Sequence, residues 1–98
     1  MLGTVLAILS FTAMLKTGEF GVFFEIEEDS IFADENPIWI GNVNSLISCS
    51  QMCARKAFCR SANYMTSGGT CSLLRETRKM YPDRLLKQKG SSYVEKVC

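Results

Sequence analysis

The chain has 98 residues, a net charge of +1 and no histidine. A chain of this length forms at most one domain. Because histidine is the commonest general base, no Ser-His-Asp or Cys-His catalytic set can be assembled from these residues. The composition therefore predicts a protein that is not an enzyme and that carries no cofactor.

The N-terminal segment is apolar up to its first charged residue, Lys16. This run is too short to span a bilayer as a helix, and it is typical of the hydrophobic region of a signal peptide. No clean cleavage motif follows it, so we place cleavage only approximately, near Thr17 or Gly18. We predict a signal peptide at residues 1–18 and a secreted domain at residues 19–98. Two alternatives remain: a buried N-terminal helix of the domain, and an uncleaved segment that anchors the chain in a membrane.

A half-buried strand is predicted from Phe20 onward. Apolar and acidic side chains alternate there, so that Val22, Phe24 and Ile26 would share one face while glutamates occupy the other. This strand would form one side of the domain's core.

A turn at residues 34–37 separates this strand from the next, because Pro37 excludes the residue before it from the helical region. Residues 38–40 read as a second, short strand. Trp39 is either a core residue or an exposed binding aromatic. We favour the core, because Trp39 lies between two isoleucines in a small domain.

Four of the five cysteines fall in one stretch, CSQMCARKAFCRSANYMTSGGTC. Its first two, Cys49 and Cys53, are four residues apart, and a helix that begins at Leu46 would place all three side chains on one apolar face. Asn44 or Ser45 would cap the N-terminus of that helix.

A hairpin is predicted after the helix. Strand-forming residues follow Cys59, residues 67–70 form a Ser-Gly-Gly-Thr turn, and residues 71–74 form the returning strand. Asn63 is polar in the middle of this hairpin, so it should either face solvent or satisfy a neighbouring backbone group.

The rest of the chain has a weaker pattern. Residues 75–90 show no clean period and are predicted to form a long loop, with a short turn near Pro82. Residues 92–97 alternate again and should complete the sheet beside the first strand.

The cysteines point to disulfides. A zinc site with four cysteine ligands is the alternative, but such sites normally contain CxxC pairs, which this chain lacks. The same absence argues against a thiol oxidoreductase. Because disulfides persist only in an oxidising compartment, the cysteines predict secretion independently of the leader. Spacing alone leaves three connectivities open for the four clustered cysteines.

The cysteine pattern resembles that of the PAN/apple family, whose modules occur in plasma kallikrein, coagulation factor XI and hepatocyte growth factor. In that family a CxxxC on a helix is followed by a third cysteine, a strand with an aromatic residue, and a fourth cysteine that leads into leucines. The matching features here are Cys49, Cys53, Cys59, Ala62-Asn63-Tyr64 and Cys71-Ser72-Leu73-Leu74, and the closing segment Ser91 to Lys96 is similar to the family's last strand.

The resemblance covers residues 20–98 and implies a small α+β fold. In this fold one helix packs across a twisted antiparallel sheet of four or five strands. The family's disulfide pairing is nested, which here implies bonds Cys49–Cys71 and Cys53–Cys59.

Cys98 departs from the family pattern. Many apple modules join their two ends through a disulfide, but no cysteine precedes Cys49 in this chain. We therefore expect Cys98 to be unpaired within the domain. It would bond a second copy, giving a disulfide-linked dimer, or a downstream domain of a longer protein in which this is the first module.

Charge is unevenly distributed along the chain. Residues 19–35 carry seven acids and no base, whereas residues 55–89 carry nine bases and two acids. A basic patch suits sulfated glycans or acidic proteins, and the alternative is two faces that neutralise each other within the fold. The candidate residues for an anionic ligand are Arg75, Arg78, Lys79, Arg84, Lys87 and Lys89. No nucleic-acid-binding motif is present, so nucleic acid is not an expected partner.

The family resemblance implies a non-catalytic extracellular module that recognises protein or carbohydrate, sulfated glycans included. The alternative is a free-standing secreted effector, such as a toxin or a protease inhibitor. A leader followed by one disulfide-rich domain fits both.

Overall fold

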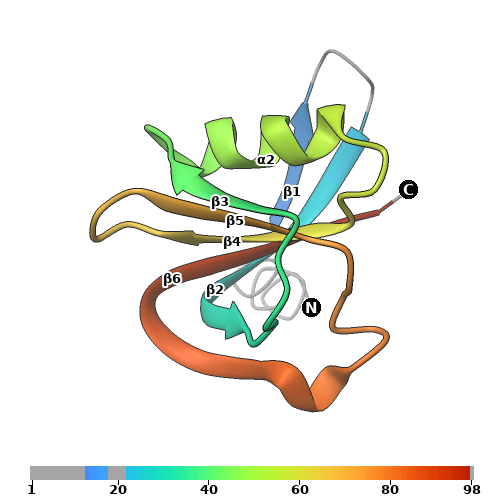
Figure 1. Cartoon of the computed structure of the whole chain (residues 1–98), viewed down its shortest axis with the longest axis vertical. Helices are drawn as coiled ribbons and strands as arrows, with labels where there is room; N and C mark the ends of the chain where they lie inside the picture. The colour runs from blue at the N-terminus through green and yellow to red at the C-terminus, as the bar shows by residue number, and fades with distance from the viewer. Residues whose placement is uncertain (1–12, 18–21, 98) are drawn as a thin grey trace, which may run out of the picture.

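The computed structural model describes residues 13–17 and 22–97. They form one six-stranded antiparallel sheet in the order β1-β2-β6-β4-β5-β3, and one α-helix crosses it (Figure 1). The α+β architecture predicted from the sequence is confirmed. The elements are β1 (Ala13–Thr17), β2 (Val22–Phe32), β3 (Trp39–Asn42), α2 (Leu46–Arg55), β4 (Ser61–Met65), β5 (Thr70–Leu74), a short 3-10 helix η1 (Pro82–Arg84) and β6 (Leu85–Lys96).

The sequence pattern does not predict β1, which lies within the segment expected to be a signal peptide. β1 pairs with the first half of β2, from Ala13 opposite Ile26 to Thr17 opposite Val22. The sheet therefore has one strand more than expected. The remainder of the expected leader, residues 1–12 and 18, lies outside the described residues. The leader and its cleavage stay predictions.

β6 begins earlier than its sequence suggests. The expected loop at residues 75–90 ends at η1, and the strand starts at Leu85, which pairs with Phe32 of β2. Residues 86–90 are all exposed, so they show no alternation of buried and exposed side chains. Their strand conformation depends on backbone pairing with a distant segment, which local periodicity does not report.

β2 and β6 bend together at a bulge where the register of their ladder shifts, at Asp29. Asp29 and Gly90 both have positive φ, 53° and 87°. The Gly90 N–H donates to the Asp29 carboxylate at 3.1 Å, and Thr66 donates from its N–H and its hydroxyl to the Gly90 carbonyl. Such bulges bend a strand and sharpen its twist. Beyond the bend, the ring of Phe32 packs against that of Tyr93, with centroids 5.8 Å apart.

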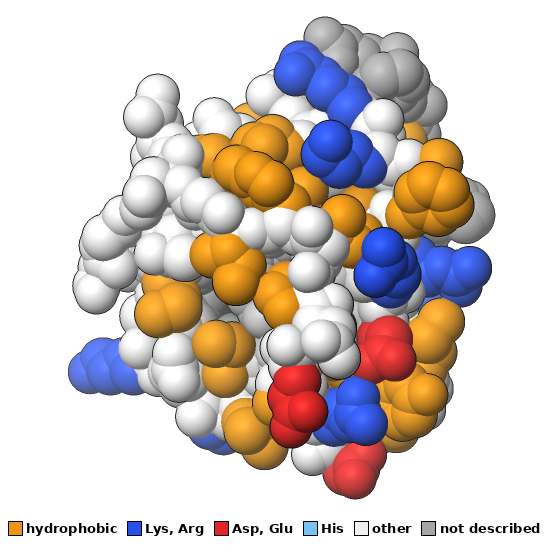
Figure 2. All heavy atoms as spheres, viewed as in Figure 1, with side chains coloured by type: hydrophobic (Ala, Val, Ile, Leu, Met, Phe, Trp, Pro, Cys, Tyr) orange, Lys and Arg blue, Asp and Glu red, His pale blue; other side chains and the backbone are white. Residues whose placement is uncertain are grey.

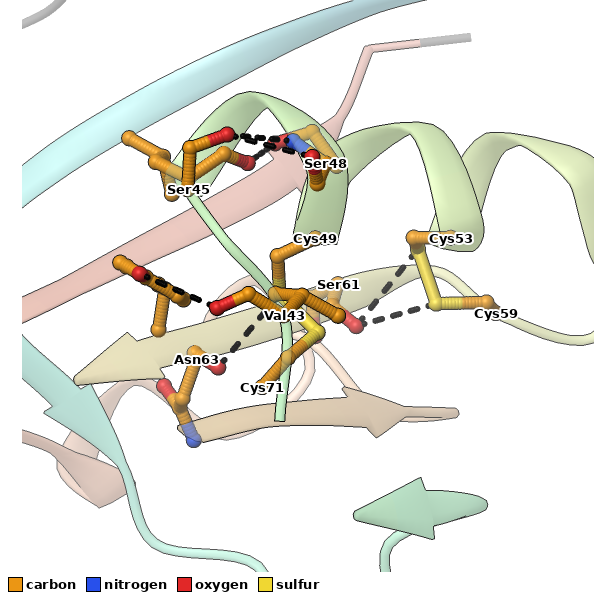
Figure 3. The surroundings of a disulfide bond; sticks show 12 residues. Val43, Ser45, Ser48, Cys49, Cys53, Cys59, Ser61, Asn63 and Cys71 are labelled. Atoms are coloured by element: carbon orange, nitrogen blue, oxygen red, sulfur yellow. Dashed lines mark hydrogen bonds between the residues drawn. A yellow bond between two sulfur atoms is a disulfide. The ribbon is translucent and has the colours of Figure 1, made fainter. Parts of the chain in front are cut away.

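Two disulfides attach α2 and the turn after it to the sheet. The helix starts at an N-cap, Ser45, whose hydroxyl accepts a hydrogen bond from the Ser48 N–H at 3.1 Å. One turn later Cys49 points from the helix toward Cys71 on β5, and the two are bonded (Figure 3). A second bond joins Cys53 to Cys59. This nested pairing is the one that the family resemblance implies.

The described residues pack into two apolar clusters, one on each face of the sheet. The larger lies under α2 and contains all four bonded cysteines with Phe24, Ala62, Leu73 and Val94, each fully buried. Trp39 packs against it, as expected of a core residue. The smaller cluster, on the opposite face, consists of Phe32, Leu74 and Tyr93.

Asn63 joins the central strand β4 to the bent end of β2. Its side chain is buried, and its amide accepts from the Phe32 N–H and donates to the Phe32 carbonyl, both at 2.9 Å. Of the two alternatives for this polar residue, the satisfied backbone partner is the one observed.

Replacing Asn63 should therefore be costly. Asn63→Ala leaves two buried backbone groups of Phe32 unpaired, each worth about 1–3 kcal/mol, so we expect a loss of about 2 kcal/mol or more in the free energy of unfolding. Urea denaturation measures this. The matched control is Asn42→Ala. It removes an exposed hydrogen bond from the Asn42 side-chain amide to the Gly68 carbonyl and should cost less than about 1 kcal/mol. Equal losses in the two variants would contradict this role of Asn63.

The disulfide pairing can be checked by peptide mapping of unreduced protein, which should link Cys49 to Cys71 and Cys53 to Cys59. The double change of Cys49 and Cys71 to Ala should lower stability by about 2–5 kcal/mol, because the bond restricts the unfolded chain. Peptides that join Cys49 to Cys59 would show a different pairing and would contradict the structure.

Candidate binding site

The segment between β5 and β6 crosses the face of the sheet opposite α2 and brings Arg78 to three glutamates. Glu25 and Glu95 stand directly opposite each other in β2 and β6. Like charges in this position repel each other. The Arg78 guanidinium lies between them and neutralises the repulsion: its Nη2 is 2.7 Å from Glu25 Oε1, its Nη1 is 2.7 Å from Glu27 Oε1 and its Nε is 3.5 Å from Glu95 Oε1.

These contacts change the pKa of Arg78. Burial lowers the pKa of its guanidinium, but the bonds to Glu27 and Glu25 and the charge of Glu95 outweigh that effect and raise the pKa above its ordinary value. Arg78 is three-quarters buried. We therefore assign it to the fold, in contrast to its place among the ligand candidates.

Glu95 is the most buried charged residue that the structure describes, with 1% of its surface exposed. Its Oε1 accepts a hydrogen bond from the Tyr93 hydroxyl at 2.7 Å, and that hydroxyl in turn accepts from the Arg78 N–H at 3.0 Å. Burial, and then the bond to Glu95, raises the pKa of the Tyr93 phenol well above its usual range. Tyr93 therefore stays protonated and keeps donating to Glu95.

The other candidate residues for an anionic ligand lie in separate places. Lys79 is 67% exposed, with its Nζ 3.6 Å from Glu95 Oε2. Arg84 pairs with Glu76 at 2.9 Å and lies over the ring of Tyr81. Arg75 is exposed nearby, and Lys87 and Lys89 are exposed at the bend of β6.

Two hollows open on the described surface. The loop hollow, of about 640 Å³, is lined by Ala33, Asp34, Glu35, Asn36, Arg75, Glu76 and Arg84. The Glu95 hollow, of about 530 Å³, is lined by Ala57, Cys59, Arg60, Thr77, Lys79, Met80, Glu95 and Lys96. Each hollow contains basic residues, so the nine bases of the sequence do not converge on one patch.

Several residues of the Glu95 hollow are absent from the sequence-based candidates. Arg60 and Lys96 supply cations, and Met80 is 45% exposed at the wall. Phe58, between two lining residues in the chain, is 74% exposed. No sequence signal joins these residues, because they come from three segments that only the fold brings together. The sequence shows Phe58 next to Cys59 but does not show that its side chain is exposed.

Figure 2 shows the character of one face of the molecule: basic side chains are dispersed over it, and hydrophobic side chains are visible between them. The acidic side chains in this view lie next to a basic one near its lower edge. Among the described residues, no group of three His, Cys, Asp or Glu side chains is arranged to hold a metal ion. The described helices are also too short or too polar to cross a membrane.

Arg78 should be more important for stability than any other basic residue in this segment. Arg78→Met leaves Glu95 buried without its nearest full charge partner, and removal of one partner from a buried pair costs roughly 3 kcal/mol. The control, Arg84→Met, breaks an exposed pair and should cost less than about 1 kcal/mol. Thermal and urea unfolding of the two variants measure both effects. If Arg78→Met unfolds no more easily than Arg84→Met, the guanidinium does not hold this face of the sheet together.

Comparison with known proteins identifies the family of the chain. No curated protein matches the chain. The profile of the PAN domain matches residues 23–98, which is most of the chain and includes α2, both disulfides and β2 to β6. PAN domains are protein- and carbohydrate-binding modules of extracellular proteins and are generally not catalytic. Together, the nested cysteine bridges, the α-helix across an antiparallel sheet and this match show that the chain belongs to the PAN domain family.

Proposed function

We propose that this domain is a secreted, non-catalytic recognition module that binds an anionic ligand, with sulfated glycans as the ligand class. The observation that carries the proposal is that three basic residues are exposed and have no acidic partner. Arg75, Lys87 and Lys89 are exposed and, within the part of the chain that the structure describes, form no ion pair with a carboxylate. These three therefore keep their charge available for a ligand.

The charge pattern of the sequence is thus explained in two parts. Two acids of β2, Glu25 and Glu27, form ion pairs with Arg78 within the fold. Lys87 and Lys89 lie exposed at the bend of β6 and make no ion pair among the described residues. Such a surface attracts polyanions and loses this attraction as salt screens it.

Extracellular location is supported by two independent features. The two disulfides need an oxidising compartment. The apolar segment at residues 1–15 is typical of a signal peptide. The family adds the third argument, because PAN domains occur in extracellular proteins.

A heparin column tests the proposal. The domain should be retained at low salt and released as the salt concentration rises, because ionic attraction weakens with screening. The double variant K87A/K89A should elute at lower salt. The matched control is N44D/Q51E, which changes the net charge by the same amount at the N-terminus of α2 and on the helix itself, across the sheet from the proposed surface.

Flow-through of the unmodified domain at low salt would refute the proposal. So would equal elution shifts in K87A/K89A and N44D/Q51E, because retention would then follow net charge and not this surface.

A further inference from the structure

We propose that the Glu95 hollow holds one acidic saccharide unit, that is, a sugar that carries both hydroxyl groups and a carboxylate. This inference goes beyond the proposed function, and the two can be tested separately. The site is separate from Lys87 and Lys89, which line neither hollow.

The first argument is the mixture of hydrogen-bonding groups. Glu95 offers only acceptors, whereas Arg60, Lys79 and Lys96 offer only donors. A purely anionic ligand would face the Glu95 carboxylate, and a purely cationic ligand would face the three bases. A hydroxyl group both donates and accepts, so a sugar can satisfy the two kinds of lining group at once.

The second argument is that one carboxylate oxygen of Glu95 can still accept a hydrogen bond. Its Oε1 takes the Tyr93 hydroxyl and the Arg78 guanidinium. Its Oε2 has no hydrogen bond from a described residue, and its nearest cation, Lys79 Nζ, is 3.6 Å away, beyond a direct hydrogen bond. Because the Lys79 side chain is 67% exposed, its ammonium group can move aside, and a hydroxyl group of the ligand can then donate to Oε2.

The third argument is the charge at the rim. Arg78 and Lys79 both lie beside Glu95, and Arg78 also pairs with Glu25 and Glu27. Arg60 is exposed and makes no ion pair among the described residues. Lys96 donates one hydrogen bond to the Lys56 carbonyl at 3.2 Å, which leaves its charge without a carboxylate. Arg60 and Lys96 are thus two cations without a carboxylate partner, next to a Glu95 carboxylate that can bind a hydroxyl group. This combination favours a sugar with an acidic substituent.

The fourth argument is the apolar flank. Phe58 is 74% exposed, and its neighbours in the chain, Ala57 and Cys59, line the hollow. The Cys53–Cys59 disulfide and a hydrogen bond from the Cys59 N–H to the Lys56 carbonyl at 3.0 Å hold this turn in place. An exposed aromatic side chain on the turn that lines a polar hollow can provide a flat surface for the C–H face of a sugar ring.

The loop hollow is larger but does not share these features. Three of its seven lining residues are acids, and Arg84 is already paired with Glu76. None of its lining residues is aromatic.

The test is an NMR titration of the ¹⁵N-labelled chain with three small probes: glucuronic acid, glucose and acetate. Glucuronic acid should shift the amide signals of residues 57–60, 77–80 and 95–96. Glucose lacks the acidic group and acetate lacks the hydroxyls, so each should bind at least about tenfold more weakly, which is about 1.4 kcal/mol.

Two surface variants locate the site. Phe58→Ala and Arg60→Ala should each weaken glucuronic acid binding at least about fivefold, while the melting temperature stays unchanged because both side chains are exposed. The matched controls are Tyr81→Ala and Arg75→Ala, an exposed aromatic and an exposed arginine outside this hollow, which should leave the affinity unchanged.

The outcomes separate this inference from the proposed function. The domain can be retained on heparin while glucuronic acid shifts no signal of the hollow, or while Phe58→Ala and Arg60→Ala bind it as well as the controls do. In either case the hollow is not the site and the proposed function stands. Acetate that binds as tightly as glucuronic acid would likewise overturn the inference, because a simple anion would then suffice. Heparin flow-through together with shifts in the hollow would support the hollow and refute the surface at Lys87 and Lys89.

Discussion

The bond between Cys49 and Cys71 fixes the α-helix of the described chain to the interior of the sheet. Cys71 lies on β5, directly opposite Tyr64 of β4, so the helix is tied to a ladder and not to an edge strand. The main apolar cluster assembles around this attachment, with Phe24, Leu73 and Val94 fully buried against it. A domain of this size buries a smaller fraction of its surface than a larger domain does, and the cross-link offsets that shortage.

On the opposite face of the sheet the described residues form no α-helix, and this face depends on a charge. Two facing glutamates, Glu25 and Glu95, would repel each other if nothing lay between them, and the Arg78 guanidinium carried by the β5–β6 connection removes this conflict. The most central base of the basic segment is therefore a structural residue. In the proposed function, the ligand is bound by bases at the margins, such as Lys87 and Lys89, and not by the base that holds the fold.

The elements that could be predicted from the sequence are those whose signals are local. The alternation in β2, the Ser45 cap of α2 and the Gly-rich turn between β4 and β5 each involve a few adjacent residues, and the structure contains all three. The start of β6 and the role of Arg78 depend on partners about fifty residues away, which no periodicity reports. The Glu95 hollow is harder still, because three separate segments supply its lining and each appears unremarkable alone.

The position of the disulfides has a mechanical consequence. Both bonds close loops within residues 49–71, and neither ties β2 to β6. In that ladder Phe24 faces Lys96, so the outer ends of the two strands lie side by side. Tension applied between residues 22 and 97 would therefore peel the two strands apart, breaking their hydrogen bonds one after another and not all together in shear. The covalent loop from Cys49 to Cys71 cannot lengthen, so under load the domain would open at its ends while its centre stays closed.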